Sequence, residues 1–267
     1  MKNKLLLTLF VIVILIIYVI YDRKLYEPFK SFRSKNKLIN NIEYSCKFYP
    51  NDKFNDSRYI IMFSKNFIGR EEKIFDHFKV DKKLRDFYNR NKQSINKSKI
   101  YELIIGFDLQ KKSNKIYFYK NTNIYGLENK NNSYNYRLYK SMYNFPKKKL
   151  DILIGNKNSD KFYQLFNIKK LIGHRVFAKY IKNTNKNKNK YELQSYHIWL
   201  HSPKLQIGKS KNKIIQLLKF YKCNTTNIDK WINKNKNKYI TWVGLTKKNN
   251  NIEVTFYYIP KLLKIWK

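Results

Sequence analysis

The stretch GFDLQKKSNKIYFY, residues 106–119, contains two apolar and aromatic segments joined by a polar turn. With its flanks it becomes two segments of strand type, YELIIGFDL (residues 101–109) and KIYFYK (residues 115–120), around the turn QKKSN. Runs rich in Ile, Tyr and Phe that are bounded by Ser, Asn and Lys are typical of antiparallel strand pairs. The stretch therefore predicts a β-hairpin.

Two further hairpins follow from the same pattern. Residues 174–182 and 191–200 flank an Asn/Lys-rich loop, and residues 238–245 and 252–259 flank the turn TKKNNN. The last hairpin, GLTKKNNNIEVTFYY, repeats the order of glycine, Lys-Lys-Asn turn and aromatic second strand that residues 106–119 show. The two stretches are either an internal repeat or two ordinary hairpins written in a biased alphabet.

Helical patterns separate the hairpins. From Glu71 to Tyr88 apolar residues recur near the 3.6 period, with Asp81 as an internal N-cap. Further helices are predicted near residues 136–143, after Asp160, from Ser210 and around residues 228–232, and a short strand is predicted at residues 58–65. The predicted fold class is α+β, with antiparallel hairpins alternating with helices in an open sheet or an αββα-type barrel.

Ahead of this domain lies the run LLLTLFVIVILIIYVIY, residues 5–21. As a helix it is about 25 Å long, near the short end of what a bilayer requires. No small-x-small cleavage site follows it, which favours a retained transmembrane helix over a cleaved signal peptide. The sequence thus predicts an anchor (residues 1–24), a juxtamembrane linker (residues 25–56) and a basic α+β domain (residues 57–267). The basic residues after the run favour the cytosolic side of a single-pass membrane protein.

The charge of the chain suggests an anionic partner. There are 57 Lys and Arg residues against 18 Asp and Glu, a formal charge of +39. Beside a bilayer such a domain attracts anionic lipids or another polyanion, so the predicted function is binding or scaffolding at a membrane surface. Nucleic-acid binding is an alternative, but most of the cations are Lys, whereas base and phosphate readout enriches Arg. An A/T-rich coding sequence would also produce this composition.

Familiar catalytic motifs are absent from the sequence. With 7 glycines in the whole chain, no Rossmann fingerprint or P-loop is present, so no nucleotide cofactor is expected. His197 and His201 lie on a predicted strand, where four residues span about 13 Å, too far to share a metal. No metal site is therefore expected. Cys46 and Cys223 would pair only in an oxidising compartment, and the sequence leaves this open.

Cations and tyrosines alternate with apolar residues on the predicted strands. Period-two alternation places Lys115 and Tyr117 on one face of their strand and Ile116 and Phe118 on the other. By the same rule Arg175 and Lys179 share a face, and Tyr257 lies opposite Phe256. If the apolar faces contact helices, the polar faces point to solvent or into a barrel lumen. There the cations would hold a phosphate or diphosphate and the tyrosine rings would shield the ligand.

The recurrence of helix and hairpin, the stretch GFDLQKKSNKIYFY with its Lys-x-Tyr-Phe strand, and the closing VTFYYIP together resemble the ABBA-type aromatic prenyltransferases. That resemblance implies a barrel of repeated α-β-β-α units whose inward Lys, Arg and Tyr side chains bind an isoprenoid diphosphate. It implies Lys115 and Tyr117 as ligands of the diphosphate, with Arg175, Lys179 and Tyr257 as further candidates. It also implies a carboxylate on the acceptor side, for which the sequence singles out no residue. Three hairpins are evident, whereas such a barrel needs about five.

Overall fold

The computed structural model describes residues 39–51, 53–63, 67–96, 103–111, 113–120, 123–129, 136–143, 156–166, 173–181, 192–200, 205–248 and 251–260. Within them, ten strands form a closed antiparallel barrel. The strands are β1 (Ile39–Phe48), β2 (Asn55–Phe63), β3 (Leu103–Asp108), β4 (Ser113–Lys120), β5 (Asn123–Asn129), β6 (Tyr136–Tyr143), β7 (Gly173–Ile181), β8 (Glu192–Trp199), β9 (Tyr239–Lys248) and β10 (Asn251–Ile259). The helices are α2 (Glu71–His77), α3 (Lys82–Asn96), α5 (Asn156–Phe166), α6 (Lys211–Phe220) and α7 (Ile228–Asn235).

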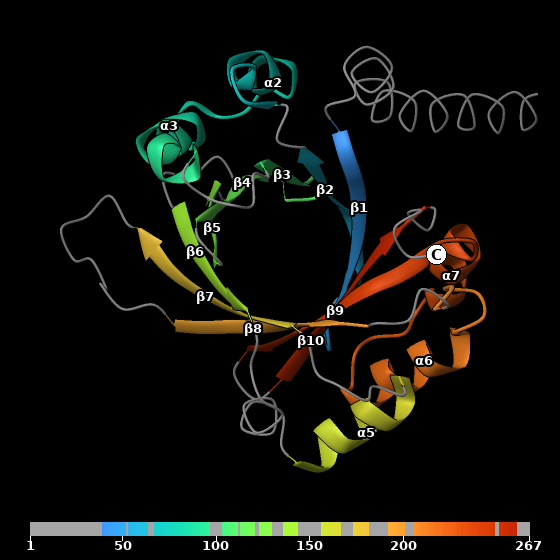
Figure 1. The fold of residues 1–267 in the computed structure, drawn as a ribbon. Coiled ribbons are helices and arrows are strands. Elements are labelled where there is room, and N and C mark those ends of the chain that lie inside the picture. The colour runs from blue at the N-terminus through green and yellow to red at the C-terminus, as the bar shows by residue number, and fades with distance from the viewer. Residues whose placement is uncertain are drawn as a thin grey trace, which may run out of the picture.

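Each strand pairs with its neighbours in the sequence, and the pairing of β1 with β10 closes the ring. The ring consists of five successive antiparallel pairs, from β1–β2 to β9–β10. In Figure 1 the helices lie outside this ring, with α2 and α3 beside β3–β5 and with α5, α6 and α7 on the opposite side. Because the helices cover the outer surface, the inner faces of the strands are left to line the lumen.

Two hydrophobic clusters attach the helices to the barrel wall. The N-terminal cluster joins outward residues of β2–β5, such as Ile61, Ile105 and Phe118, to Leu84 and Tyr88 of α3. The C-terminal cluster joins outward residues of β1 and β8–β10 to the helices α5–α7, and its largest member is Trp231 of α7. The largest fully buried side chains of the two clusters are aromatic, and each such side chain buries about 150–250 Å² of surface. The outward faces of the strands are therefore the apolar ones.

The helices before β3 form as their sequence predicts. The backbone N–H of Lys83 donates to the Asp81 carboxylate over 2.9 Å, so Asp81 caps the first turn of α3. Arg85 then links α3 to α2 through ion pairs with Glu72 and Asp76. The predicted interruption of this helical segment at Asp81 is confirmed.

Several predictions about the sheet need correction. Of the two predicted arrangements, the open sheet is wrong and the sheet is a closed barrel, and between β3 and β6 the described residues contain no helix. Residues 136–143, predicted as a helix, form the strand β6, because β5 and β7 both offer it a hydrogen-bonding edge. The strand β1 lies inside residues 25–56, so part of the predicted linker is barrel wall. Cys46 and Cys223 are both buried and unpaired with each other.

The described part of the structure does not support the prediction of a transmembrane anchor and of a single-pass membrane protein. In the described part of the chain no helix is long and apolar enough to cross a bilayer. The longest of them, α3, has 15 residues and is amphipathic, whereas a spanning helix needs about 20 apolar residues. Residues 5–21 themselves lie outside the described residues. The predicted anchor, the membrane localisation and the scaffold function that depended on them are therefore not supported by the described residues.

Candidate functional site

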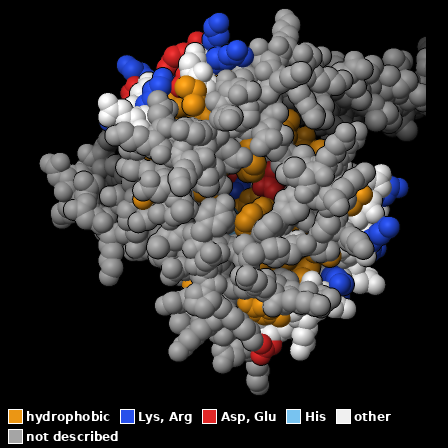
Figure 2. Space-filling view, viewed as in Figure 1, with side chains coloured by type: hydrophobic (Ala, Val, Ile, Leu, Met, Phe, Trp, Pro, Cys, Tyr) orange, Lys and Arg blue, Asp and Glu red, His pale blue; other side chains and the backbone are white. Residues whose placement is uncertain are grey.

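The inner wall of the barrel is polar. On β1, Glu43, Ser45 and Lys47 alternate with the outward Tyr44, Cys46 and Phe48. The strands β2–β5 and β8–β10 continue this inner face, and they contribute Arg58, Asp108, Lys115, Tyr117, Glu128, Ser195, His197, Glu253, Thr255 and Tyr257. Figure 2 shows that the molecule is hollowed near the middle of the ring, where acidic and basic side chains lie among hydrophobic ones. Charged groups concentrated in a hollow are the usual mark of a ligand site.

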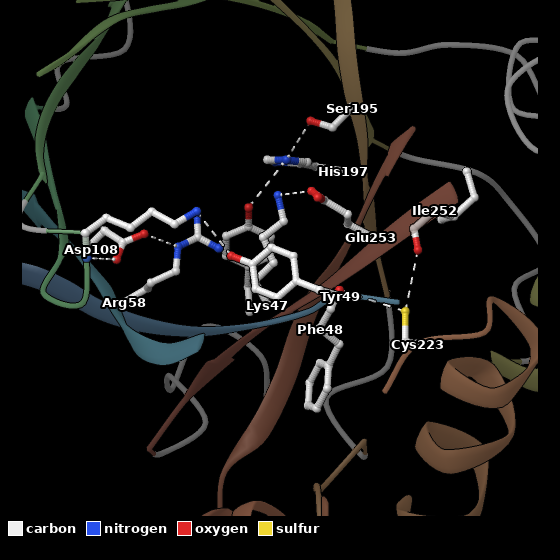
Figure 3. A network of polar contacts seen from close by, with 12 residues as sticks. Lys47, Phe48, Tyr49, Arg58, Asp108, Ser195, His197, Cys223, Ile252 and Glu253 are labelled. Carbon is white, nitrogen blue, oxygen red and sulfur yellow. Dashed lines mark hydrogen bonds and ion pairs between the residues drawn. The ribbon is translucent and has the colours of Figure 1, made fainter. Parts of the chain in front are cut away.

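Arg58 is the central cation of this wall. Its Nε lies 3.4 Å from a carboxylate oxygen of Asp108, and this carboxylate also accepts hydrogen bonds from the Asn55 side chain and the Lys111 backbone N–H, both over 3.0 Å. Asp108 is thereby held in one position, as Figure 3 shows. The Nη1 of Arg58 is buried and has no hydrogen-bond partner among the described residues. A buried charged donor without a partner is costly, so an acceptor placed beside this atom would be stabilising.

Two lysines flank Arg58, and each is paired with a carboxylate of a neighbouring strand. Lys47 contacts Glu253, and Lys115 lies 2.8 Å from Glu128. Burial lowers the pKa of Lys47 to about 8, against the opposing effect of Glu253, and the positive charge of Arg58 lowers it further. Burial and the charge of Arg58 likewise lower the pKa of Lys115, while Glu128 raises it. The three cations therefore act on one another inside one low-dielectric space.

Glu43 differs from the other carboxyl groups of the lumen. It is 5% exposed, and its described hydrogen-bond partner is the Thr241 hydroxyl of β9. Burial raises the pKa of Glu43 to about 7, and the hydrogen bond from Thr241 only partly opposes this. A carboxyl group with such a pKa gains or loses its proton near neutral pH, as a general acid or base must.

The raised pKa of Glu43 predicts a pH-dependent stability. The folded protein holds this proton up to about pH 7, whereas the unfolded chain releases it near pH 4.5. The contribution of Glu43 to the free energy of unfolding is fully present below pH 4.5 and is lost as the pH rises through 7. The free energy of unfolding falls by at most about 1.4 kcal/mol per pH unit over this window. Chemical denaturation across this window should show the loss in the wild type and not in Glu43→Gln. Parallel pH profiles of the two proteins would contradict the prediction.

His197 lies in contact with two hydroxyl groups. Its Nε2 is 3.2 Å from the hydroxyl of Ser195, which lies on the same strand β8 (Figure 3), and 3.4 Å from the hydroxyl of Tyr257 on β10, with β9 between the two strands. Burial raises the pKa of Tyr257 to about 12, so its hydroxyl keeps its proton, and the tautomer of His197 sets the direction of both hydrogen bonds. A Cβ built at Gly244 would lie 3.2 Å from the His197 ring and 3.3 Å from the Tyr257 ring. Both rings thus lie against the wall.

Tyr117 lies flat on the wall between two glycines. A Cβ built at Gly126 of β5 would meet Cδ1 of the Tyr117 ring at 2.1 Å, and one built at Gly106 of β3 would meet the other side of the ring at 3.5 Å. Gly126 is the direct register partner of Tyr117. Only glycine at position 126 leaves room for the Tyr117 ring on the strand. The ring therefore lies flat on the wall with its π surface toward the lumen.

The structure places three of the five predicted site residues on the lumen wall: Lys115, Tyr117 and Tyr257. Arg175 and Lys179 lie on β7, but their side chains lie outside the described part of the structure. The backbone register pairs Arg175 with Tyr196, whose own ring packs in the C-terminal cluster. We do not include Arg175 and Lys179 in the site.

Sequence reasoning missed Glu43, Lys47 and Arg58. The first two lie in a stretch predicted as linker, although the alternation of INNIEYSCKF, with polar Glu43, Ser45 and Lys47 at every second position, is the period of a strand. Arg58 begins the predicted strand at residues 58–65, which starts three residues earlier in the structure. Its partner Asp108 is 50 residues away in the chain, so no local pattern connects them.

Comparisons with known proteins support the fold. No protein-family model matches the sequence, and no curated protein matches it. Two solved structures share the architecture: the PriB binary complex with product diphosphate, with a TM-score of 0.54 over 82% of this chain and 79% of that one, at 8% identity, and the apo form of the prenyltransferase PriB, with a TM-score of 0.52 over 83% and 80%, at 8% identity. At 8% identity these two matches show that the fold is shared. The chain thus resembles the ABBA-type prenyltransferases in the architecture of its barrel.

Proposed function

We propose that the chain is an enzyme that binds an isoprenoid diphosphate in the barrel lumen and transfers the prenyl group to an aromatic acceptor. The observation that carries the proposal is the unpartnered Nη1 of Arg58, buried in a lumen that also holds Lys47 and Lys115. Guanidinium and ammonium groups are the donors that phosphate oxygens prefer. A diphosphate is the small anion with enough oxygens to reach several of these cations together.

Aromatic rings on the same wall fit the remainder of such a substrate. The Tyr117 ring lies two residues from Lys115 on the same face of β4, and Tyr257 lies close enough to Arg58 for the guanidinium charge to act on its hydroxyl. Rings beside an allylic chain stabilise positive charge that develops when the carbon–oxygen bond breaks. The lumen thereby combines an anion site with a cation-stabilising wall, which is what prenyl transfer requires.

The fold adds support. Two of the solved structures that share this barrel are of the prenyltransferase PriB, one of them in complex with product diphosphate. Because the identity is 8%, the activity of that protein bears on this chain only as a proposal, and it is the chemistry of Arg58, Lys47 and Lys115 that supports it here.

The proposal is tested with the full chain. Titration calorimetry with inorganic diphosphate should show saturable binding, with weaker binding to inorganic sulfate. Incubation with radiolabelled dimethylallyl or geranyl diphosphate and a panel of indoles and phenols should release diphosphate and yield a prenylated product. A protein that binds no diphosphate and transfers no prenyl group under these conditions would refute the proposal.

A further inference from the structure

The outer surface formed by α6, α7 and the loops beside them is basic and almost free of acids. Residues 205–240 contain nine lysines, no arginine and one acidic residue, Asp229. Eight of these lysines are exposed, among them Lys213 and Lys219 of α6 and Lys230 of α7. We call the exposed lysines of residues 205–240 the α6–α7 basic surface. Figure 2 shows blue side chains and no red ones at the right of the view, where Figure 1 places α7.

The helices on the other side of the barrel carry a different balance of charge. Residues 67–96, which include α2 and α3, contain eight Lys and Arg residues and five Asp and Glu residues. The acids there pair with cations: Arg85 with Glu72 and Asp76, and Lys92 with Glu71. A coding bias toward lysine acts on both helical layers alike, so it does not explain why one layer is nearly free of acids. The α6–α7 basic surface is therefore a local feature of the fold.

The lysines of this surface are accessible to a partner. Two of them form ion pairs with described residues: Lys211 lies 2.8 Å from Asp229, and Lys234 lies 3.5 Å from Asp56. The two lysine side chains are 48% and 52% exposed. An exposed pair contributes at most about 1 kcal/mol to stability, and salt weakens it further. A phosphate can therefore replace either carboxylate at small cost.

The apolar residues of α6 and α7 face inward. Ile214, Leu217 and Trp231 are buried in the C-terminal cluster. Among the described residues the exposed large hydrophobic side chain is Ile68, ahead of α2 on the other side of the barrel. A protein interface has an apolar and aromatic centre, and a helix that lies in a bilayer surface inserts apolar residues. The α6–α7 basic surface offers neither, so its recognition chemistry is that of charge alone.

A nucleic-acid backbone matches a surface of this kind. Duplex DNA carries one negative charge per about 1.7 Å of its length. Lys211 and Lys219 lie eight residues apart on α6, about 12 Å along its axis, and Lys230 and Lys234 lie about 6 Å apart along α7. Several lysines can therefore meet phosphates of one strand together. The lack of arginine in residues 205–240 agrees with contacts to the backbone, because the commonest specific base contact uses a bidentate side chain.

We propose that the α6–α7 basic surface binds the phosphate backbone of nucleic acid, irrespective of base sequence. This function goes beyond the proposed prenyl transfer and does not depend on it. The helices α6 and α7 lie outside the ring of strands, and their buried faces pack on the outward side of β1 and β8–β10 (Figure 1). The barrel wall therefore separates the surface from the cations of the lumen, and the two functions can be tested apart.

The proposal is tested on the full chain by fluorescence anisotropy with a short fluorescein-labelled DNA duplex. Binding should weaken as salt rises, and two duplexes of unrelated sequence should bind within about twofold of each other, because backbone contacts carry no sequence information. The triple variant Lys213→Gln/Lys219→Gln/Lys230→Gln should bind at least about tenfold more weakly at low salt. Its logarithmic salt slope should be smaller than that of the wild type by about 2–3, because each lost phosphate contact removes about 0.9.

A matched variant controls for net charge. Lys73→Gln/Lys79→Gln/Lys82→Gln removes the same charge from exposed positions on or beside α2 and α3, and it should bind the duplex within about twofold of the wild type, because salt screens charges beyond about 10 Å. Both triple variants should bind inorganic diphosphate as the wild type does. Equal losses of duplex binding in the two variants would overturn the proposal, since binding would then follow net charge and not this surface.

Two further measurements need no variant. Acetylation of the full chain, read by mass spectrometry, should be slowed by the bound duplex at Lys213, Lys219 and Lys230 and not at Lys73 or Lys82. Unchanged acetylation of the first three lysines would refute the proposal. Vesicles of phosphatidylserine and phosphatidylcholine test the other polyanionic partner, and a chain that binds them but not the duplex would refute it as well. Failure of diphosphate binding and prenyl transfer in the wild type would refute the proposed enzyme and leave this surface untouched.

Discussion

Replacing Arg58 with Met should weaken the binding of inorganic diphosphate by about 10–100-fold, because charge-assisted hydrogen bonds contribute about 1.5–3 kcal/mol each. The same change leaves Asp108 buried without its cation, and removing one partner of a buried pair costs about 3–5 kcal/mol of stability. Two of the hydrogen bonds to Asp108 remain, from Asn55 and from the backbone of Lys111, so the lower end of this range is expected. Calorimetry and chemical denaturation measure the two effects.

A second variant separates binding from stability. In Arg58→Met/Asp108→Asn the amide oxygen can still accept from Asn55 and Lys111, and no uncompensated charge is buried. Stability should largely return, whereas diphosphate binding should not. Arg85→Met is the matched control, since the ion pairs of Arg85 lie on the exposed surface of α2 and α3 and should contribute at most about 1 kcal/mol. Diphosphate binding that persists in the stable double variant would contradict the assignment of Arg58.

Gly126→Ala should destabilise the barrel and slow prenyl transfer in its lumen. The new Cβ would lie 2.1 Å from Cδ1 of Tyr117 and 2.9 Å from the backbone oxygen of Ile116, so the ring has to leave the wall and the strand has to shift. Overpacking of this kind costs about 1–3 kcal/mol. A ring displaced toward the lumen also occupies the space of the prenyl chain, so transfer should fall by at least about tenfold. Denaturation curves and transfer assays test the two consequences.

Gly106→Ala provides the comparison. Its Cβ would meet Ile60 at 3.3 Å and Lys115 at 3.4 Å, contacts that small shifts of side chains relieve. This variant should lie close to the wild type in both measurements. Adding Tyr117→Ala to Gly126→Ala should recover part of the stability, because the clash with the ring disappears while the one with the Ile116 carbonyl remains. Equal effects of the two glycine variants would show that the Tyr117 ring does not lie on Gly126.

The local sequence determined the hairpins and the inward and outward faces of their strands. In β4 the alternation of Lys115 and Tyr117 with Ile116 and Phe118 correctly separates the lumen face from the face packed on α3. Strand β10 follows the same rule, with Tyr257 inward and Phe256 in the C-terminal cluster. These faces are predictable because side chains alternate strictly along any strand, whatever the strand pairs with.

The predictions that failed all needed information from distant parts of the chain. Residues 136–143 form a strand because two neighbouring strands satisfy their backbone hydrogen bonds, and tertiary pairing of this kind overrides local propensity. The apolar run at residues 5–21, which suggested a membrane protein, lies outside the described residues, and among those residues no helix is able to cross a bilayer. The resemblance to ABBA-type prenyltransferases, which rested on two hairpins and a strand motif, is confirmed for the fold.

The sequence by itself determined three of the five strand pairs, β3–β4, β7–β8 and β9–β10, and which side chains share a face on their strands, since these depend on the local period of the chain. Only the tertiary structure decided that the faces enclose one lumen. The pairing of β1 with β10 joins segments about two hundred residues apart and closes the ring. Closure brings Arg58, Lys47 and Lys115 together and buries Glu43 beside Thr241. The shifted pKa values follow from that burial, because the cost of a charge depends on the solvent that the closed barrel excludes.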